Sequence, residues 1–169
     1  MWTDGKNRLL KIGGNGDIVK EIIQCYEKFK NQPYDHVKDI RGIGAARDIT
    51  VNEQCYSIFK HLADNVTYRE DTYGEQLIKS PARLLEDKVG DCKSYAMYCC
   101  SCLHCLGIPH KFRFVNFDGG DQYTHVYAVA LDENNNEIIL DAVETDENGT
   151  PIYNYARPYA KKKDISYYV

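Results

Sequence analysis

The sequence predicts an α+β protein in which helices come first and an antiparallel sheet follows. Apolar residues at helical spacing dominate up to about residue 106, whereas short aromatic and β-branched segments separated by turn residues dominate from residue 111 onwards. A run of helices followed by a run of strands is typical of the α+β class. The 169 residues, 43% of them apolar, contain no repeat or linker, so we expect a single domain over residues 1–169.

The first third of the chain is predicted to cover the core. Residues 1–16 become glycine-rich at their end and lack periodicity, which predicts an irregular arm. An amphipathic helix is expected over residues 18–30 with Asp17 as its N-cap, because the apolar residues recur every three or four positions. A short helix within residues 36–48 and a longer one over residues 51–65 complete this layer.

A central helix is predicted to follow. Ser80-Pro81 is a favourable helix start and predicts a short helix over residues 81–86. Gly90-Asp91 then supplies a turn and an N-cap, and residues 92–106 contain neither glycine nor proline. Gly107-Ile108-Pro109 ends the helix. Cys92 therefore falls in the first turn of the central helix.

The rest of the chain predicts a meander of antiparallel strands. Turn residues separate segments rich in aromatic and β-branched side chains, and Asn148-Gly149 is a strong hairpin signal. The strands expected are, in order, residues 111–117, 124–131, 137–143, 152–156 and 165–169. We therefore divide the domain into an N-terminal arm with helices (1–50), a core (51–143) and C-terminal strands (144–169).

Composition excludes several classes of function. The formal net charge is −4, and the only basic run is Lys161 to Lys163, which is not a nucleic-acid footprint. Apolar runs fall short of the roughly 20 residues of a membrane span, and the N-terminus lacks the layout of a secretory leader. Residues 42–47 look superficially like a nucleotide loop but follow no strand. We expect no nucleic-acid or membrane partner and a cytoplasmic location; the oligomeric state is open.

Seven cysteines also favour a reducing compartment. Five of them lie in the predicted central helix, where neighbours cannot all be disulfide partners. Cys99 fits the core. Cys100 and His104 can converge on a helix, but Cys102 points to the other side, which argues against a metal site. We expect no metal and no cofactor.

Cys92 has two candidate partners in the predicted sheet. A cysteine nucleophile needs a base and a third group that orients the base. If the hairpin between residues 124–131 and 137–143 centres on Glu133, His125 and Asp141 lie directly opposite each other on one sheet face. This requires a loop of odd length, because a one-residue slip would put the two side chains on opposite faces.

The order and spacing of these motifs resemble the transglutaminase-like superfamily, whose core is papain-like, as seen in bacteria and bacteriophages. The resemblance covers roughly residues 51–143. It is carried by Ser80-Pro81 with Leu84-Leu85, Gly90-Asp91-Cys92 with Tyr95-Ala96, Leu106-Gly107-Ile108-Pro109, Thr124-His125-Val126-Tyr127 and Leu140-Asp141. It implies a nucleophile at the N-terminus of a central helix packed on an antiparallel sheet. By residue-wise transfer Cys92 is the nucleophile, His125 the general base and acid, and Asp141 the orienting residue.

The chain departs from this family's pattern beside the site. Many members carry tryptophans next to the histidine and before the aspartate, where this chain has Val126-Tyr127 and Ile138-Ile139-Leu140. The only tryptophan is Trp2, so the substrate groove is expected to differ.

The leading hypothesis is a thiol enzyme that transfers acyl groups from peptide or amide bonds: a cysteine peptidase or amidase if water accepts the acyl group, a transglutaminase if an amine does. The helix N-terminus and His125 both favour the Cys92 thiolate. The backbone N–H of Cys92 and a second group, Gln76 or else Tyr73, are the expected oxyanion donors. The alternative is a non-catalytic structural or interaction module that retains the fold, for example in phage assembly.

Overall fold

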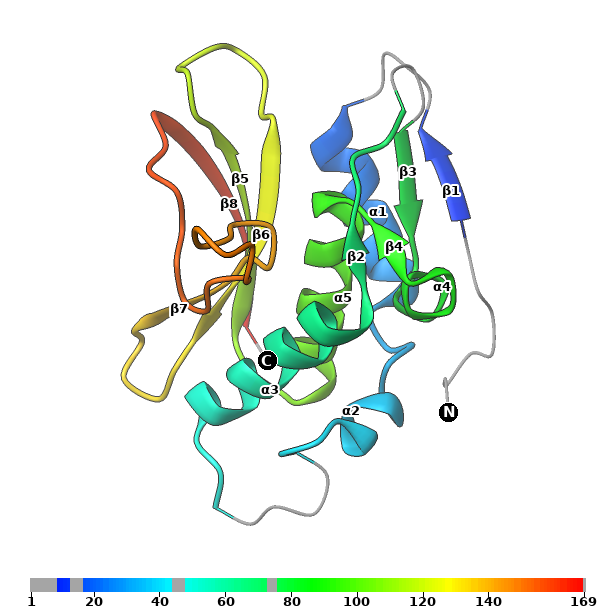
Figure 1. The fold of residues 1–169 in the computed structure, drawn as a ribbon, viewed down its shortest axis with the longest axis vertical. Coiled ribbons are helices and arrows are strands. Elements are labelled where there is room, and N and C mark those ends of the chain that lie inside the picture. Colours follow the sequence, from blue (N-terminus) through cyan, green and yellow to red (C-terminus); the bar gives the residue numbers. More distant parts are fainter. Residues whose placement is uncertain (1–8, 13–16, 44–47, 73–75, 169) are drawn as a thin grey trace.

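The computed structural model describes residues 9–12, 17–43, 48–72 and 76–168. A four-stranded antiparallel sheet forms one layer, and the helices lie together on one of its faces (Figure 1). The central helix α5 (Cys92–Cys105) packs directly against two of the strands, β5 (His110–Asn116) and β6 (His125–Leu131). This arrangement is the predicted α+β architecture, with a helix packed on an antiparallel sheet.

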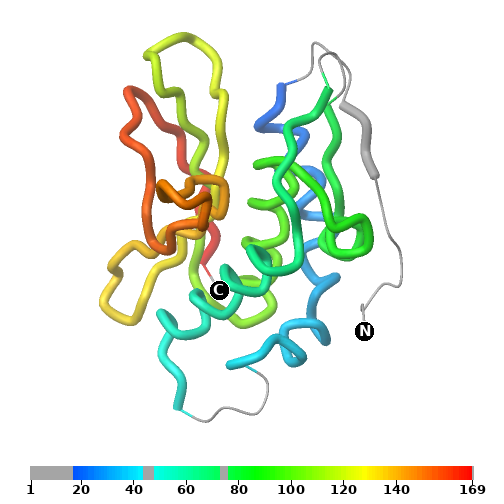
Figure 2. Tube along the Cα trace, viewed as in Figure 1, coloured from blue at the N-terminus to red at the C-terminus, as the bar shows by residue number. Residues whose placement is uncertain are grey.

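Helix α5 is buried on all sides rather than along one stripe. Every residue from Lys93 to Leu103 is buried, because the sheet covers one side of the helix and other elements cover the rest. Those elements are α1 (Ile18–Phe29), α3 (Val51–Asn65), α4 (Pro81–Asp87) and β3 (Gln76–Lys79). The tube in Figure 2 shows the N-terminal helices beside α5, and they also reach the sheet: α3 contacts β7 (Glu137–Leu140), and the Tyr26 hydroxyl of α1 lies 2.7 Å from His110 Nε2 of β5.

The predicted helix starts are confirmed. Asp17 caps α1 through its side chain, Thr50 forms a capping box at α3, and Ser80 caps α4 with Pro81 in the first turn. The helix expected within residues 36–48 is only one turn long, α2 (His36–Asp39). Gly42, at φ +95°, follows soon after it, and residues 44–47 lie outside the described part of the chain.

The large sheet has the strand order β7-β6-β5-β8, with β7 at Glu137–Leu140 and β8 at Lys161–Tyr167. The meander β5-β6-β7 is therefore as predicted. Phe112, Phe114 and Ala128 belong to the main core shared with α5, whereas Val115 and Tyr127 belong to a smaller cluster. The segment after β7 covers this second cluster with Ala156 and Tyr159.

The predicted strand over residues 152–156 is wrong. The Asn148-Gly149 turn forms, with the Asp146 carboxylate accepting hydrogen bonds from two backbone N–H groups, but pairing stops at one bridge between Thr145 and Pro151. Proline has no N–H with which to extend a ladder. The last strand begins at Lys161, four residues before the predicted start, and pairs with β5 along its length; Val169 is not described.

Two small strand pairs were not predicted. The expected irregular arm contains β1 (Leu9–Ile12), which pairs antiparallel with β3, and β2 (Thr67–Tyr68) pairs parallel with β4 (Val89–Gly90). Strands of two to four residues carry too little periodicity to be recognised from sequence. The second pair ties Tyr68 to the approach of α5. No helix in the described ranges is long and apolar enough to cross a membrane.

Candidate active site

Cys92 opens α5 directly after its N-cap. The Asp91 carboxylate accepts hydrogen bonds from the backbone N–H groups of Lys93 and Ser94, which fixes the first turn. The turn is tight as well. A Cβ at Gly90 would lie 2.4 Å from Leu84 Cδ1, a side chain that is itself fully buried, so only glycine fits there. Cys92 remains half-buried, unlike the residues that follow it.

Buried charges surround this turn. The Lys93 ammonium pairs with Asp91 and lies 3.1 Å from an Asp71 carboxylate oxygen. The Lys93 and Asp91 side chains are only 7% and 5% exposed, so their charges depend on each other. Burial lowers the pKa of Lys93, but the Asp91 carboxylate outweighs it and holds that pKa above its usual value. The negative charge of Asp91 is thus matched by a lysine and by backbone N–H groups.

His125 and Asp141 are joined by a short hydrogen bond. Nε2 of His125 lies 2.7 Å from Oδ2 of Asp141, and the two side chains are 8% and 3% exposed. The backbone N–H of Val143 approaches the other carboxylate oxygen at 3.4 Å. The structure therefore brings together the histidine and the aspartate that the sequence paired.

The predicted register of this hairpin is wrong by two residues. Leu131 pairs with Glu137 and Ala128 with Leu140, so the position opposite His125 is residue 143, beyond the end of β7. The five-residue loop, 132–136, is odd, as required, and a shift of two preserves the face. His125 and Asp141 are diagonal rather than direct neighbours, a distance that a histidine side chain spans.

Cys92 is the second partner of the His125 ring. Burial lowers the pKa of His125, but hydrogen bonds with Asp141 and Cys92 and the charges of both groups outweigh it and raise this pKa to about 10. Because Asp141 uses Nε2, Nδ1 is the ring nitrogen left for Cys92. Phe117 stacks on the ring at 5.8 Å and Tyr127 lies at 5.7 Å, which restricts its orientation.

The structure describes only one of the two predicted oxyanion side chains, Gln76. Gln76 begins β3 with an exposed side chain and pairs through its backbone with Ile12. Tyr73 lies outside the described residues. The structure gives no hydrogen bond, within the ranges it describes, between Gln76 and Cys92.

Sequence reasoning missed two residues near the site. Tyr68 is half-buried, and the charges of Cys92 and Asp141 raise its pKa. The sequence signal for its short strand was the β-branched and aromatic segment Val66-Thr67-Tyr68. Glu144 places a carboxylate oxygen within 4.8 Å of the ligand atoms of both His125 and Asp141, and no sequence pattern indicated this.

The cluster of His125, Asp141 and Glu144 has three potential metal ligands. The Nε2 atom of His125 is already engaged in its hydrogen bond with Asp141 Oδ2 at 2.7 Å, and the other partner of the ring is Cys92. We therefore interpret His125 and Asp141 as a hydrogen-bonded pair with the Glu144 carboxylate close by. The metal-ligand group found among the described residues includes none of the helix cysteines, and the Cys105 Sγ contacts the Lys30 carbonyl oxygen at 3.3 Å.

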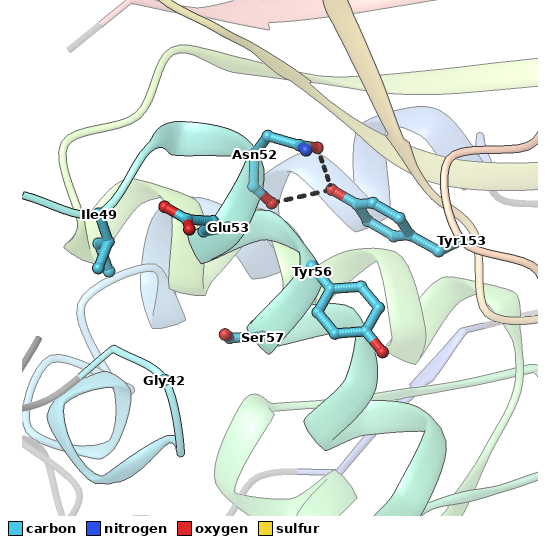
Figure 3. A pocket seen from close by; sticks show the side chains of 7 residues that line it. All are labelled: Gly42, Ile49, Asn52, Glu53, Tyr56, Ser57 and Tyr153. Atoms are coloured by element: carbon cyan, nitrogen blue, oxygen red, sulfur yellow. Dashed lines mark hydrogen bonds between the residues drawn. The ribbon is translucent and has the colours of Figure 1, made fainter.

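A pocket of about 380 Å³ lies elsewhere, at the start of α3 (Figure 3). Its lining includes Tyr56, Ser57 and Tyr153, and the Tyr153 hydroxyl donates hydrogen bonds to Asn52, as the dashed lines show. None of the lining residues is Cys92, His125 or Asp141. The pocket is therefore distinct from the site.

A helix-start cysteine beside a histidine and aspartate pair, on a helix packed against an antiparallel sheet, is the arrangement of papain-like thiol proteins. The chain belongs to the transglutaminase-like superfamily: the model of that family matches residues 40–142, more than half of the 169 residues. The match contains Cys92, His125 and Asp141.

A solved structure shares the fold. It is a protein from Cytophaga hutchinsonii described as a candidate cysteine protease, 14% identical, with a TM-score of 0.50. The alignment covers 95% of this chain and 62% of that one, so this chain spans less than two thirds of its length. A comparison with curated proteins found no match.

Proposed function

We propose that this protein is a thiol-dependent acyl-transfer enzyme acting on peptide or amide bonds, with Cys92 as nucleophile, His125 as general base and acid, and Asp141 as the orienting residue. One observation carries the proposal: the His125 ring is held between the Asp141 carboxylate, at 2.7 Å, and the Cys92 side chain. Family membership and a relative described as a candidate cysteine protease support it.

The reaction follows from these positions. The Cys92 thiolate attacks the carbonyl carbon, a C–S bond forms, and the carbonyl electron pair moves to oxygen. When the intermediate collapses, the C–N bond breaks and the amine leaves with a proton from protonated His125. Water or an amine then gives its proton to His125, attacks the thioester and releases Cys92 as thiolate. Asp141 keeps the ring oriented and stabilises its charge both during formation of the thioester and during its breakdown.

The half-buried position of Cys92 suits this role. Of the seven cysteines, Cys92 and Cys105 are the two that are not fully buried, and both lie on α5. Only Cys92 has a histidine as partner. Cys105 is therefore a matched control: a half-buried thiol on the same helix with a pKa raised by burial.

The test is acylation with an activated ester, p-nitrophenyl acetate. We expect a burst of nitrophenolate and an acetyl adduct located on Cys92 by peptide mass spectrometry, lost in Cys92→Ala and retained in Cys105→Ser. Burst kinetics of the same size in Cys92→Ala, or an adduct no faster on Cys92 than on Cys105, would contradict the proposal.

The acyl acceptor is tested separately. Protein substrates containing glutamine are incubated with a labelled primary amine, and both amine incorporation and chain cleavage are measured. Incorporation that depends on Cys92 assigns a transglutaminase; cleavage or deamidation without incorporation assigns a hydrolase.

A further inference from the structure

We propose that the Tyr68 hydroxyl donates a hydrogen bond to the oxyanion that forms when Cys92 attacks a carbonyl, together with the backbone N–H of Cys92. This inference rests on the proposed acyl-transfer function and adds a catalytic residue to it. It also replaces Gln76 as the side-chain donor.

The backbone holds Tyr68 beside the start of α5. Strands β2 and β4 pair in parallel, with Tyr68 opposite Gly90. The N–H of Thr67 donates to the Lys88 carbonyl and that of Arg69 to the Gly90 carbonyl, each at 2.9 Å. The hydrogen bonds of the residues on either side therefore hold Tyr68 beside Gly90, which precedes the N-cap of α5.

The Tyr68 ring is fixed as well. It meets the Tyr95 ring edge-to-face at 5.6 Å, and Tyr95 lies one helical turn after Cys92. Tyr95 is buried, and its hydroxyl donates to the Val66 carbonyl at 3.1 Å, which connects it back to the strand that carries Tyr68. Both rings and Cys92 therefore pack at the same end of α5.

The hydroxyl itself remains a donor. Burial raises the pKa of Tyr68, and the charges of Cys92 and Asp141 raise it further, so the phenol keeps its proton at all physiological pH values. In the described ranges its hydroxyl has no hydrogen-bond partner, whereas the hydroxyls of Tyr26, Tyr95 and Tyr153 each have one. A half-buried, unpartnered O–H next to a nucleophile is available to a developing negative charge.

Gln76 fits the role less well. It is exposed at the beginning of β3, on the strand pair with β1, whereas Tyr68 is half-buried on the strand that pairs with β4 immediately before Cys92. An oxyanion donor is most effective where water is excluded and the donor is already oriented.

The chemistry distinguishes an oxyanion donor from a group that tunes the thiol. Acylation by p-nitrophenyl acetate moves the carbonyl electron pair onto oxygen, where a donor lowers the barrier. Alkylation by iodoacetamide displaces iodide from carbon and creates no oxyanion. A residue that acts on the oxyanion therefore affects acylation alone, whereas a residue that acts on the thiolate affects both reactions.

The test is Tyr68→Phe, which retains the ring contact with Tyr95. The control is Tyr56→Phe, at a tyrosine that is 47% exposed and lines the separate pocket at the start of α3. We expect acylation of Cys92 to slow by about 10²- to 10³-fold in Tyr68→Phe, with iodoacetamide alkylation and its pH profile within threefold of wild type. Tyr56→Phe should change neither reaction. Far-ultraviolet circular dichroism and urea denaturation verify that both variants fold.

Acylation unchanged in Tyr68→Phe would overturn the inference, and so would a parallel decrease in acylation and alkylation, which would assign Tyr68 to the thiolate. Failure of the proposed function is a different result, because in that case the wild-type protein would not acylate Cys92 faster than Cys105.

Discussion

The Nε2 of His125 lies 2.7 Å from Oδ2 of Asp141 although the two residues are diagonal, not opposite, across β6 and β7. Asp141 follows the last residue of β7, Leu140, where the strand is no longer held by the ladder. Its carboxylate therefore reaches across to the first residue of β6 and is 3% exposed there. In the proposed mechanism this buried aspartate orients the ring and stabilises its charge.

Replacing Asp141 with alanine should impair catalysis far more than replacing its neighbour. We expect Asp141→Ala to slow Cys92 acylation by about 10²- to 10⁴-fold, because His125 loses its orienting partner. Glu144→Gln is the control: its carboxylate lies in the same cluster but makes no hydrogen bond to His125 in the part of the chain the structure describes, so we expect less than a fivefold effect. Equal effects in both variants would argue against a specific role for Asp141.

We expect His125 to make the free energy of unfolding depend on pH in the neutral to alkaline range. Its folded-state pKa of about 10 exceeds the unfolded value of about 6.5, so its stabilisation is complete below pH 6.5 and is lost as the pH rises through 10. We expect the free energy of unfolding, measured with urea, to fall across this window by at most about 1.4 kcal/mol per pH unit. In His125→Gln that part of the slope should disappear; an identical slope would show that other groups cause it.

The His125 pKa itself should respond to Cys92. Because the Cys92 side chain is one of the two partners that raise it, Cys92→Ala should lower the His125 pKa from about 10, as measured by nuclear magnetic resonance titration of the imidazole. Cys105→Ser, at the other end of α5, should leave it unchanged. A titration that is the same in Cys92→Ala as in wild type would mean that the two side chains do not interact.

Gly90 should not tolerate a side chain. In Gly90→Ala the new Cβ would meet Leu84 Cδ1 at 2.4 Å and Ser94 Cβ at 3.3 Å, and Leu84 is fully buried. Overpacking of this kind costs about 1–3 kcal/mol. Gly120→Ala is the control, because its nearest neighbour, Asn116 Nδ2, lies at 3.4 Å, and we expect a change below about 0.5 kcal/mol. Urea denaturation of both variants measures the difference.

Arg113 should control stability in acid. Its guanidinium donates to Asp164 on β8 and to Glu137 on β7 at 2.8–3.0 Å. The Arg113 hydrogen bonds hold the pKa of Glu137 at about 2, and, against the effect of burial, that of Asp164 at about 2 as well. Stability from these carboxylates is present above about pH 4 and lost as the pH falls through 2.

Removing this arginine should therefore weaken the pH dependence of stability in acid. We expect Arg113→Leu to be less stable than wild type at pH 7, with a weaker dependence of unfolding free energy on pH between 4 and 2. Lys162→Ala is the control, since Lys162 also pairs with Asp164 but is 42% exposed. An unfolding free energy that depends on pH between 4 and 2 in Arg113→Leu as it does in wild type would contradict this role of Arg113.

The sequence predicts the helices and the meander because their signals are local. Asp17, Ser80 and Asp91 cap helices as expected, and the limits of α3 agree residue for residue. The odd loop that puts His125 and Asp141 on one face was also predictable, since it depends only on the alternation of side chains.

What failed depends on details of turns and on pairing between distant segments. The hairpin register shifted by two because Asp132 closes a five-residue loop, accepting hydrogen bonds from Asn134 and Asn136. Pro151 stopped a predicted strand, and β2 exists only because β4 pairs with it. Tyr68 came to the site through that pairing, so its position could not be read from the residues around it.

The most direct test is the rate of Cys92 alkylation by iodoacetamide at neutral pH, measured by peptide mass spectrometry in wild type and in His125→Ala, with Cys105 as the internal reference. We expect Cys92 to be alkylated much faster than Cys105 in wild type, because burial raises the pKa of Cys105 to about 12, and we expect this excess to be lost in His125→Ala. Equal alkylation rates for Cys92 and Cys105 in wild type, or a Cys92 rate that is unchanged in His125→Ala, would contradict the proposed role of Cys92 and His125.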